Sequence, residues 1–233
     1  MAIQKEILKR PEGKRILLVD DHPMVRERLA EVIGREPDLA VCGEAEDRFT
    51  ALELIATMKP HLAIVDLTLK RSSGMELIAD IGSQFPDLAI LVVSMHDEMI
   101  YAERVIHAGA KGYITKQEAT RKIMVAIRAV LNGDIYLSEK MAAQIAATAV
   151  GRPWAKTGLP VSNLSNRELR VFEMIGQGQG TRQIADELHL DMRTIETYRA
   201  RIKEKLNLKN ANELLQYAIH WKQSGGSHGL NTV

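Results

Sequence analysis

Acidic, hydroxyl and basic side chains stand at the ends of four short apolar runs in the first half of the chain. These run-ending residues are Asp20-Asp21, Asp66, Ser94 and Lys116. Carboxylates that lie close together repel one another and need a counter-charge. A hard divalent cation such as Mg²⁺, with oxygen ligands, supplies that charge, and a lysine nearby can pair with a phosphate. The set therefore favours phosphoryl transfer onto a carboxylate.

The elements that must position these residues alternate between strands and helices. The strands are short, rich in Val, Ile and Leu, and lack polar alternation, which is typical of strands covered on both faces; we predict them at 16–21, 39–44, 62–67, 88–94 and 111–115. Amphipathic stretches at 24–35, 49–58, 75–84, 98–107 and 119–131 predict helices between them. This order predicts an α/β domain, a five-stranded parallel sheet with helices on both faces. An antiparallel α+β sandwich would need hairpin turns that the pattern lacks.

In open parallel sheets, ligands bind beyond the carboxyl ends of the strands. The run-ending residues would therefore meet at one edge. Any one of these aspartates alone is more simply a helix N-cap or a turn residue. The whole set, on four strands, is difficult to explain in that way.

Composition restricts the class of protein further. The chain has 233 residues and one cysteine, Cys42, which excludes an intramolecular disulfide framework and a multi-cysteine zinc site. The longest apolar run, Leu88–Val93, is far shorter than a membrane span requires, and the first residues lack a signal-peptide core. We therefore expect a cytoplasmic protein with no membrane partner.

The chain divides into parts of different character. We predict an N-terminal extension (1–14), an α/β domain (15–136), a linker helix and flexible linker (137–160), a helical domain (161–222) and a disordered tail (223–233). The overall charge of +1 hides a division, because residues 1–137 carry 18 Lys and Arg against 21 Asp and Glu, whereas residues 162–233 carry 10 against 8.

The first domain resembles the receiver domain of two-component response regulators, over about residues 14–133. The resemblance rests on Ile16–Asp21, Asp66, Ser94, Tyr113 and Lys116. It implies a flavodoxin-like fold in which Asp66 is the phosphoacceptor. It also implies Mg²⁺ bound by Asp20, Asp21, Asp66 and the backbone carbonyl of Thr68. Lys116 and Ser94 would contact the phosphoryl group, and Tyr113 would swing inward as a switch.

Two segments depart from the receiver pattern. Leu69 and Lys70 stand where many receivers have Met-Pro, and Gln117 stands where many have Pro. Neither departure removes a reacting group. A phosphatase of the haloacid dehalogenase type also forms a phosphoaspartate, but it needs a second Asp two residues after the nucleophile. Thr68 occupies that position here.

The second domain has helical periodicity throughout. Apolar faces at 169–175, 184–188 and 195–206 predict three helices, and Ser165 with Glu168 forms the capping-box pattern. The short connection at 189–193 predicts a helix-turn-helix. Arg193–Lys209 carries a net charge of +4, which suits a phosphate backbone. The alternative is a four-helix module for protein contacts, with the charges as a solvated face.

This domain resembles the LuxR-type DNA-binding domain of NarL/FixJ regulators, over about residues 161–222. LSNRE, Gly178, Ile184-Ala185, Leu188, Thr194–Thr197 and Lys205-Leu206 carry the resemblance. It implies that 193–206 is the recognition helix and that 211–220 contacts a second copy. Candidate DNA-binding residues are Thr181, Arg193, Thr194, Glu196, Thr197, Arg199, Arg201, Lys203 and Lys205. Candidate dimer contacts are Leu214, Leu215 and Ala218.

Together the two resemblances imply a response regulator rather than an enzyme. A sensor histidine kinase would phosphorylate Asp66, and a homodimer would bind half-sites in promoter DNA. Two other functions stay open at this point. One is a DNA-binding protein that is independent of phosphorylation and uses the receiver only to dimerise, and the other is a phosphatase.

Overall fold

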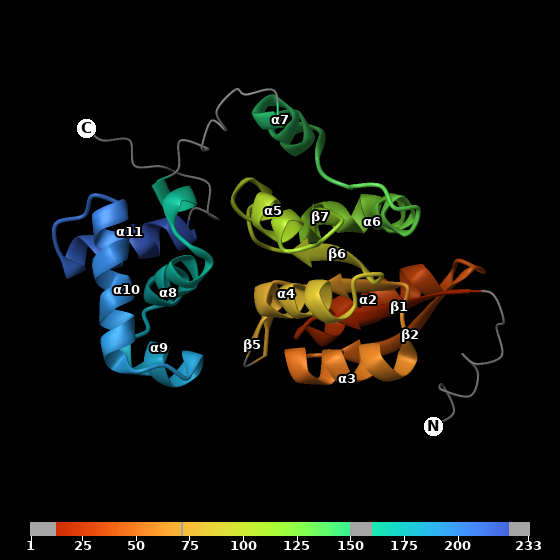
Figure 1. Ribbon diagram of the computed structural model, residues 1–233, viewed down its shortest axis with the longest axis horizontal. Coiled ribbons are helices and arrows are strands. Elements are labelled where there is room, and N and C mark those ends of the chain that lie inside the picture. Colours follow the sequence, from red (N-terminus) through yellow and green to blue (C-terminus); the bar gives the residue numbers. More distant parts are fainter. Residues whose placement is uncertain (1–12, 71, 150–159, 224–233) are drawn as a thin grey trace. The chain divides into compact units, whose positions relative to one another are not determined.

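The computed structural model describes residues 13–70, 72–149 and 160–223 (Figure 1). The chain forms two compact units, which divide between Ala143 and Gln144. This division falls within α7 (Glu139–Ala149), the predicted linker helix. Within the described residues, no helix combines the length and the apolar character that a membrane crossing requires.

The first unit contains the predicted parallel sheet, which is confirmed. Its strands are β1 (Lys14–Val19), β2 (Leu39–Ala45), β3 (Leu62–Val65), β6 (Ala89–Ser94) and β7 (Gly112–Thr115), in the spatial order β2-β1-β3-β6-β7. All four pairings are parallel. The connecting helices are α2 (Pro23–Gly34), α3 (Arg48–Met58), α4 (Gly74–Gln84), α5 (Glu98–His107) and α6 (Lys116–Leu131).

Helices cover both faces of this sheet. One face packs on α2 and α6 through a core that includes Leu18, Ile33, Ile64, Leu91 and Ile127. α3, α4 and α5 cover the other face (Figure 1). Successive strand side chains point to opposite faces, so a strand between two helical layers must be apolar at every position. The four residues of β3 are accordingly all buried.

A small antiparallel hairpin follows the third strand and was not predicted. It pairs β4 (Thr68–Leu69) with β5 (Ser72–Ser73). The hairpin occupies the segment where Leu69 and Lys70 depart from the receiver pattern. Leu69 is buried, and the Lys70 N–H donates to the carbonyl of Glu46 at 3.1 Å. The departure therefore ties this loop to the end of β2.

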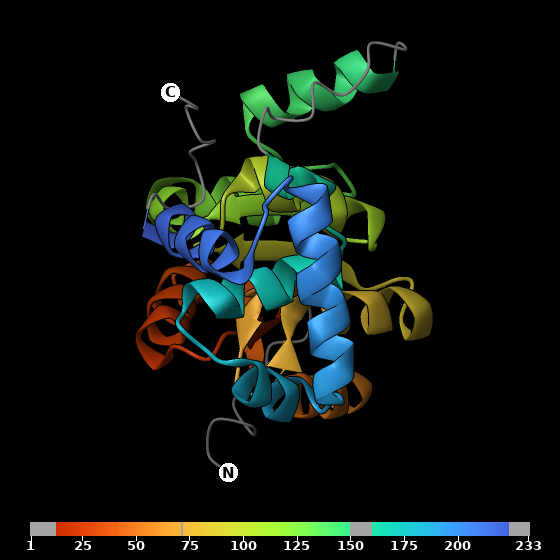
Figure 2. The same cartoon turned by 90° about the vertical axis from the view of Figure 1, so that its left-hand side faces the viewer.

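The second unit is helical, as predicted. It comprises the 3₁₀ turn η1 (Pro160–Asn163), α8 (Asn166–Gly176), α9 (Thr181–Leu188), α10 (Met192–Lys205) and α11 (Ala211–Gln223). The capping box at the start of α8 is present, with Ser165 and Glu168 bonded reciprocally. α8 packs across α10 in both views (Figures 1 and 2). His189 turns the chain between α9 and α10 in the left-handed conformation (φ 52°).

Aromatic packing joins α8 to α11. The ring of Phe172 lies 5.7 Å from that of Tyr217 and 5.4 Å from that of Trp221. Gly176, the last residue of α8, allows this close approach, because a Cβ there would lie 2.5 Å from the carbonyl oxygen of Ala218.

We therefore predict that Gly176→Ala destabilises the second unit by about 1–3 kcal/mol, the usual cost of overpacking a filled core. Calorimetric unfolding of the full chain should show a lower transition temperature for this unit only. Gly34→Ala is the matched control, since Gly34 also ends a helix but an added Cβ there meets nothing within 4 Å. The control should be neutral or slightly stabilising. Equal effects of the two substitutions would contradict the close packing.

Candidate functional site

The carboxyl edge of the sheet brings together the predicted acidic, hydroxyl and basic side chains. Asp20 follows β1, Asp66 follows β3, Ser94 ends β6 and Lys116 begins α6 directly after β7. Parallel pairing in register places these four strand ends side by side. Asp20, Asp66 and Ser94 are all buried.

The ammonium of Lys116 bridges two buried carboxylates. Its Nζ lies 2.6 Å from Asp20 Oδ2 and 2.7 Å from Asp66 Oδ2. Burial works to lower the pKa of Lys116, but the charges and hydrogen bonds of Asp66 and Asp20 outweigh it, so the pKa is raised. The lysine therefore stays protonated and offsets part of the repulsion between the two acids.

Ser94 holds the other oxygen of Asp66. Its hydroxyl donates to Asp66 Oδ1 at 2.8 Å. One oxygen of the Asp66 carboxylate thus accepts a hydrogen bond from the Ser94 hydroxyl, and the other is paired with the Lys116 ammonium. Both groups can also contact an oxygen of a phosphoryl group attached to that carboxylate.

The acidic cluster has room for a further positive charge. Asp20, Asp21, His22 and Asp66 each offer one ligand atom within 4.8 Å of the others. Asp21 Oδ1 is buried without a hydrogen-bond partner. It lies 2.7 Å from His22 Nδ1, which is an electrostatic contact without hydrogen-bond geometry. A buried carboxylate oxygen left in this way fits a hard cation as its missing partner.

Two further groups position the cluster and were not predicted from the sequence. The guanidinium of Arg26 donates to the backbone carbonyl of Asp20 at 2.6 Å and to Glu44 at 3.0 Å. The imidazole of His96 lies 3.1 Å from the hydroxyl of Thr68. No sequence spacing marks either contact, because each joins elements that only the fold brings together.

Tyr113 is already inside the protein. The side chain is fully buried on β7, and its hydroxyl donates to the carbonyl of His96 at 2.8 Å. Burial, followed by the charge of Asp66, raises the pKa of Tyr113 well above its ordinary value, so the phenol stays neutral. The inward position expected only on switching is thus present here with Ser94 bonded to Asp66.

Gly74 is required by the backbone next to Asp66. A Cβ at this position would lie 2.0 Å from the Asp66 carbonyl oxygen and 2.7 Å from Leu67 Cα. The Gly74 N–H donates to the Leu67 carbonyl at 2.9 Å. Any side chain here would displace the backbone of Asp66 and Leu67.

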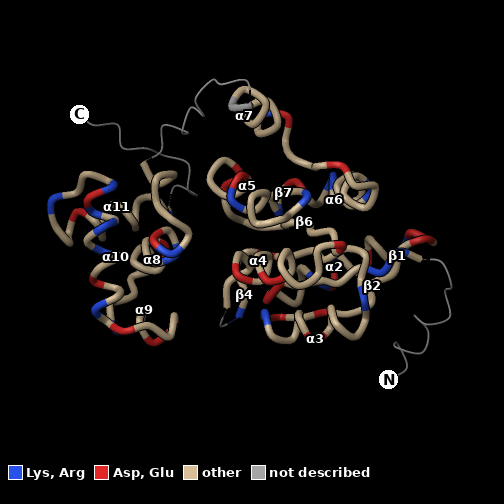
Figure 3. Tube along the Cα trace, in the orientation of Figure 1, with Lys and Arg blue, Asp and Glu red and all other residues tan. Residues whose placement is uncertain are grey.

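Helix α10, which the sequence predicts to be the recognition helix, exposes a mixed charged face. Arg193, Glu196, Thr197 and Arg201 are exposed, whereas Ile195 and Ile202 are fully buried. Figure 3 shows basic and acidic residues along this helix. The hydroxyl of Thr181, at the start of α9, donates to Glu196 at 2.7 Å, so these two candidates contact each other.

Several candidate contacts have structural partners within the second unit. Lys205 Nζ lies 2.6 Å from the buried carboxylate of Glu168. Lys205 therefore balances that buried charge, and its contact with DNA stays a prediction. Arg199 is mostly covered and lies 3.9 Å from Glu196. Thr194 is half-buried, and Lys203 is half-buried on the flank of the helix.

The choice of dimer contacts needs a correction. Leu214 and Ala218 are fully buried within the second unit, where Ala218 approaches Gly176 of α8. Their surfaces are already covered, so they cannot also bind a second copy. Leu215 alone of the three is exposed, at 36%, and it stays a prediction.

Lys116→Met should lower the free energy of unfolding of the first unit by about 3–5 kcal/mol in EDTA, because two buried carboxylates lose their counter-charge. Adding Asp66→Asn should recover part of that loss. Chemical denaturation of the single and double variants measures the coupling.

Lys122→Met is the control, because Lys122 is exposed and its 3.5 Å pair with Glu118 is a surface ion pair. It should cost less than about 1 kcal/mol. A Lys116→Met variant as stable as this control would show that the bridge contributes nothing.

Two family models match the chain, one on each unit. The response regulator receiver domain matches residues 16–128. The bacterial regulatory proteins of the luxR family match residues 162–218.

Characterised relatives match along nearly the whole length. The oxygen regulatory protein NreC of Staphylococcus carnosus is 33% identical over 212 residues, which covers 89% of this chain and 98% of that protein. NreC of Staphylococcus aureus is 32% identical over the same share of both chains.

Solved structures agree with the fold. RcsB of Salmonella enterica serovar Typhimurium, bound to promoter P1flhDC with phosphomimetic BeF3-, matches 89% of this chain and 98% of its own, with TM-score 0.68 and 24% identity. A LuxR-family response regulator from Aurantimonas sp. SI85-9A1 is 37% identical over 60% of this chain and 99% of its own, with TM-score 0.55.

The paired family models and the full-length relatives agree with the parallel sheet, its acidic edge and the helix-turn-helix. This chain belongs to the NarL/FixJ family of two-component response regulators, with a receiver domain followed by a LuxR-type DNA-binding domain.

Proposed function

We propose that Asp66 accepts a phosphoryl group from the phosphohistidine of a sensor kinase. The observation that supports this most is the placement of the Asp66 carboxylate between Ser94 and Lys116. A carboxylate oxygen would form a bond to phosphorus as the bond from phosphorus to the kinase imidazole breaks. Lys116 and Ser94 would then contact the oxygens of the new acyl phosphate.

Mg²⁺ is the cofactor that we propose for this step. Asp20, Asp21, Asp66 and the backbone carbonyl of Thr68 would hold it. Asp21 Oδ1, which is buried without a hydrogen-bond partner, supports this assignment. When bound, the ion would neutralise negative charge on the transferring group. Arg26 would keep the Asp20 backbone in place through its 2.6 Å hydrogen bond. The receiver acts on itself, so we regard it as a switch rather than an enzyme.

The switch follows from competition for the partners of Asp66. A phosphoryl group would attract the Ser94 hydroxyl and the Lys116 ammonium, so both would leave their present geometry. Ser94 and the buried Tyr113 flank His96, whose backbone carbonyl accepts a hydrogen bond from the Tyr113 hydroxyl. Movement of Ser94 would therefore reach Tyr113 through the β6–α5 connection. We propose this pair as the route by which phosphorylation changes the receiver surface.

The output that we propose is regulation of transcription through α10. Arg193, Arg201 and Lys203 have no ion-pair partner within the described part of the chain and would contact phosphates, which positions the helix on DNA. Glu196 and Thr197 lie on the exposed face and would meet base edges in the major groove. Thr181 would act through its bond to Glu196.

We also propose a homodimer that binds two half-sites. One of the solved relatives is a complex of RcsB with DNA, and another contains two RcsB dimers on two parallel DNAs. Leu215 is the remaining candidate contact on α11. We further propose a receiver domain at 15–136 and a DNA-binding domain at 161–222, joined by a linker. We also propose a cytoplasmic location. The N-terminal extension and the tail lie outside the described residues except at 13–14 and 223.

Asp66→Asn should abolish the acid-stable but base-labile phosphate that forms with a small phosphodonor and Mg²⁺, because the amide is not a nucleophile. Phosphate-affinity electrophoresis measures the labelled fraction. Asp134→Asn, a change of the same type at an exposed position, should label normally. Full labelling of Asp66→Asn would refute the acceptor assignment.

Arg193→Ala with Lys203→Ala should weaken binding to a duplex selected from a random pool by the wild-type chain. Loss of two phosphate contacts should also reduce the slope of log K against log salt concentration by about 2. Fluorescence anisotropy at several salt concentrations gives both values.

Lys222→Ala removes an exposed positive charge near the end of α11 and serves as the control for this experiment. It should leave the slope unchanged. An unaltered slope in the double variant would place the DNA interface elsewhere.

A further inference from the structure

A pocket of about 690 Å³ lies at the amino edge of the receiver sheet, at the opposite ends of the strands from Asp66. Its walls come from the segments that lead into the strands: Lys14 at β1, the connection before β3, residues 84–89 before β6 and Lys111 before β7. The end of α6 closes one side. A volume of this size suits a small organic ligand.

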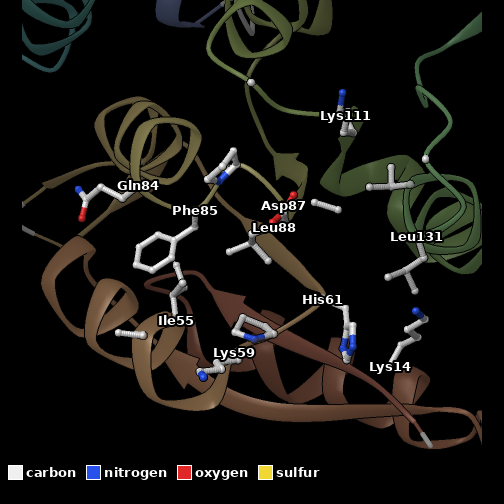
Figure 4. Close-up of a pocket in the computed structure, with 17 residues that line it drawn as sticks. Lys14, Ile55, Lys59, His61, Gln84, Phe85, Asp87, Leu88, Lys111 and Leu131 are labelled. Atoms are coloured by element: carbon white, nitrogen blue, oxygen red, sulfur yellow. The ribbon is translucent and has the colours of Figure 1, made fainter.

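Part of the pocket wall is apolar. Ile55, Phe85, Leu88, Val130 and Leu131 line it (Figure 4). Leu88 and Val130 are buried, and Phe85 is half-buried. A ligand with an apolar body would cover this surface and gain free energy in proportion to the apolar area removed from water.

The rim carries an excess of positive charge. Lys14, Lys59 and Lys111 line the pocket together with one acid, Asp87. All three lysines are exposed, and within the described residues none has an ion-pair partner. In Figure 4, Lys14 and Lys59 lie on the side of His61, and Lys111 lies on the opposite side. The nearby acids Glu36 and Asp38 are paired with Arg128.

His61 presents a hydrogen-bond donor on this rim. Its Nδ1 accepts from the backbone N–H of Arg15 at 2.9 Å. Burial, then the charges of Arg15 and Lys14, lower the pKa of His61, so the ring is neutral at neutral pH. A neutral ring that accepts at Nδ1 carries its proton on Nε2. That N–H has no acceptor within the described residues, so it is available to a ligand.

The negative end of α3 does not cancel this charge. The carbonyls that end a helix attract cations, and α3 ends at the pocket. The Arg15 guanidinium donates to the carbonyls of Met58 and Lys59, with Nη2 at 2.7 Å from the second. Arg15 thus satisfies these carbonyls, and the Lys14 and Lys59 ammonium groups stay available for an anion.

We propose that this pocket binds a small organic carboxylate with an apolar body. The carboxylate would lie between Lys14 and Lys59 and accept from His61 Nε2. The apolar body would pack on Phe85, Ile55 and Leu88. The proposal concerns the edge opposite Asp66 and does not rest on the phosphorylation chemistry.

The test is a titration of the ¹⁵N-labelled full chain with 4-phenylbutyrate, in which the backbone amide chemical shifts are recorded at each ligand concentration. Saturable shifts should appear at Lys14, His61 and Lys111 and not at Asp66. The neutral 4-phenylbutanol and inorganic phosphate should each bind at least fivefold more weakly, because each supplies only half of the recognition.

The double substitution Lys14→Gln with Lys59→Gln should weaken the binding of 4-phenylbutyrate at least fivefold. It should leave the affinity for 4-phenylbutanol unchanged. Lys122→Gln, which removes an exposed lysine of α6 that does not line the pocket, should bind like the wild type. Absent shifts at the pocket, equal affinity for the alcohol, or an unaffected double variant would each overturn the proposal. Phosphate binding as tight as that of 4-phenylbutyrate would replace it with a bare anion site.

Discussion

The receiver depends on one electrostatic constraint, which is that acidic side chains are buried together at the end of a sheet. Lys116 meets this constraint by bridging Asp20 and Asp66 at 2.6 and 2.7 Å. The parallel register places the lysine there, because β7 ends where β6 and β3 end. In the proposed function, a group that binds Asp66 would change the partners of Lys116 and Ser94.

The two units also differ in charge. The first domain concentrates acids that fit a cation and a phosphoryl group. The second carries half of its ten basic residues on α10, although one of them, Lys205, is already paired with Glu168. The near balance of 31 basic and 30 acidic residues is therefore the sum of an acidic first domain and a basic second half.

Much of this architecture could be predicted, because a strand covered on both faces and an amphipathic helix leave regular patterns. The sheet, the helical second domain and the Ser165 capping box followed from local sequence. The β4–β5 hairpin did not, since it has two residues per strand. Burial of Leu214 and Ala218 was also missed, because an amphipathic helix shows that it has an apolar face but not what covers that face. Arg26, His96 and the Glu168–Lys205 pair join segments that only the tertiary fold brings together.

In the proposed function, chemistry at Asp66 controls the affinity of α10 for DNA. The most direct measurement is the dissociation constant of the full chain for its selected duplex, with and without beryllofluoride and Mg²⁺. We expect tighter binding of the wild-type chain with beryllofluoride, and no effect of beryllofluoride on the Asp66→Asn variant. Equal affinity of the wild-type chain in both conditions would contradict it, and would favour a DNA-binding protein that is independent of phosphorylation.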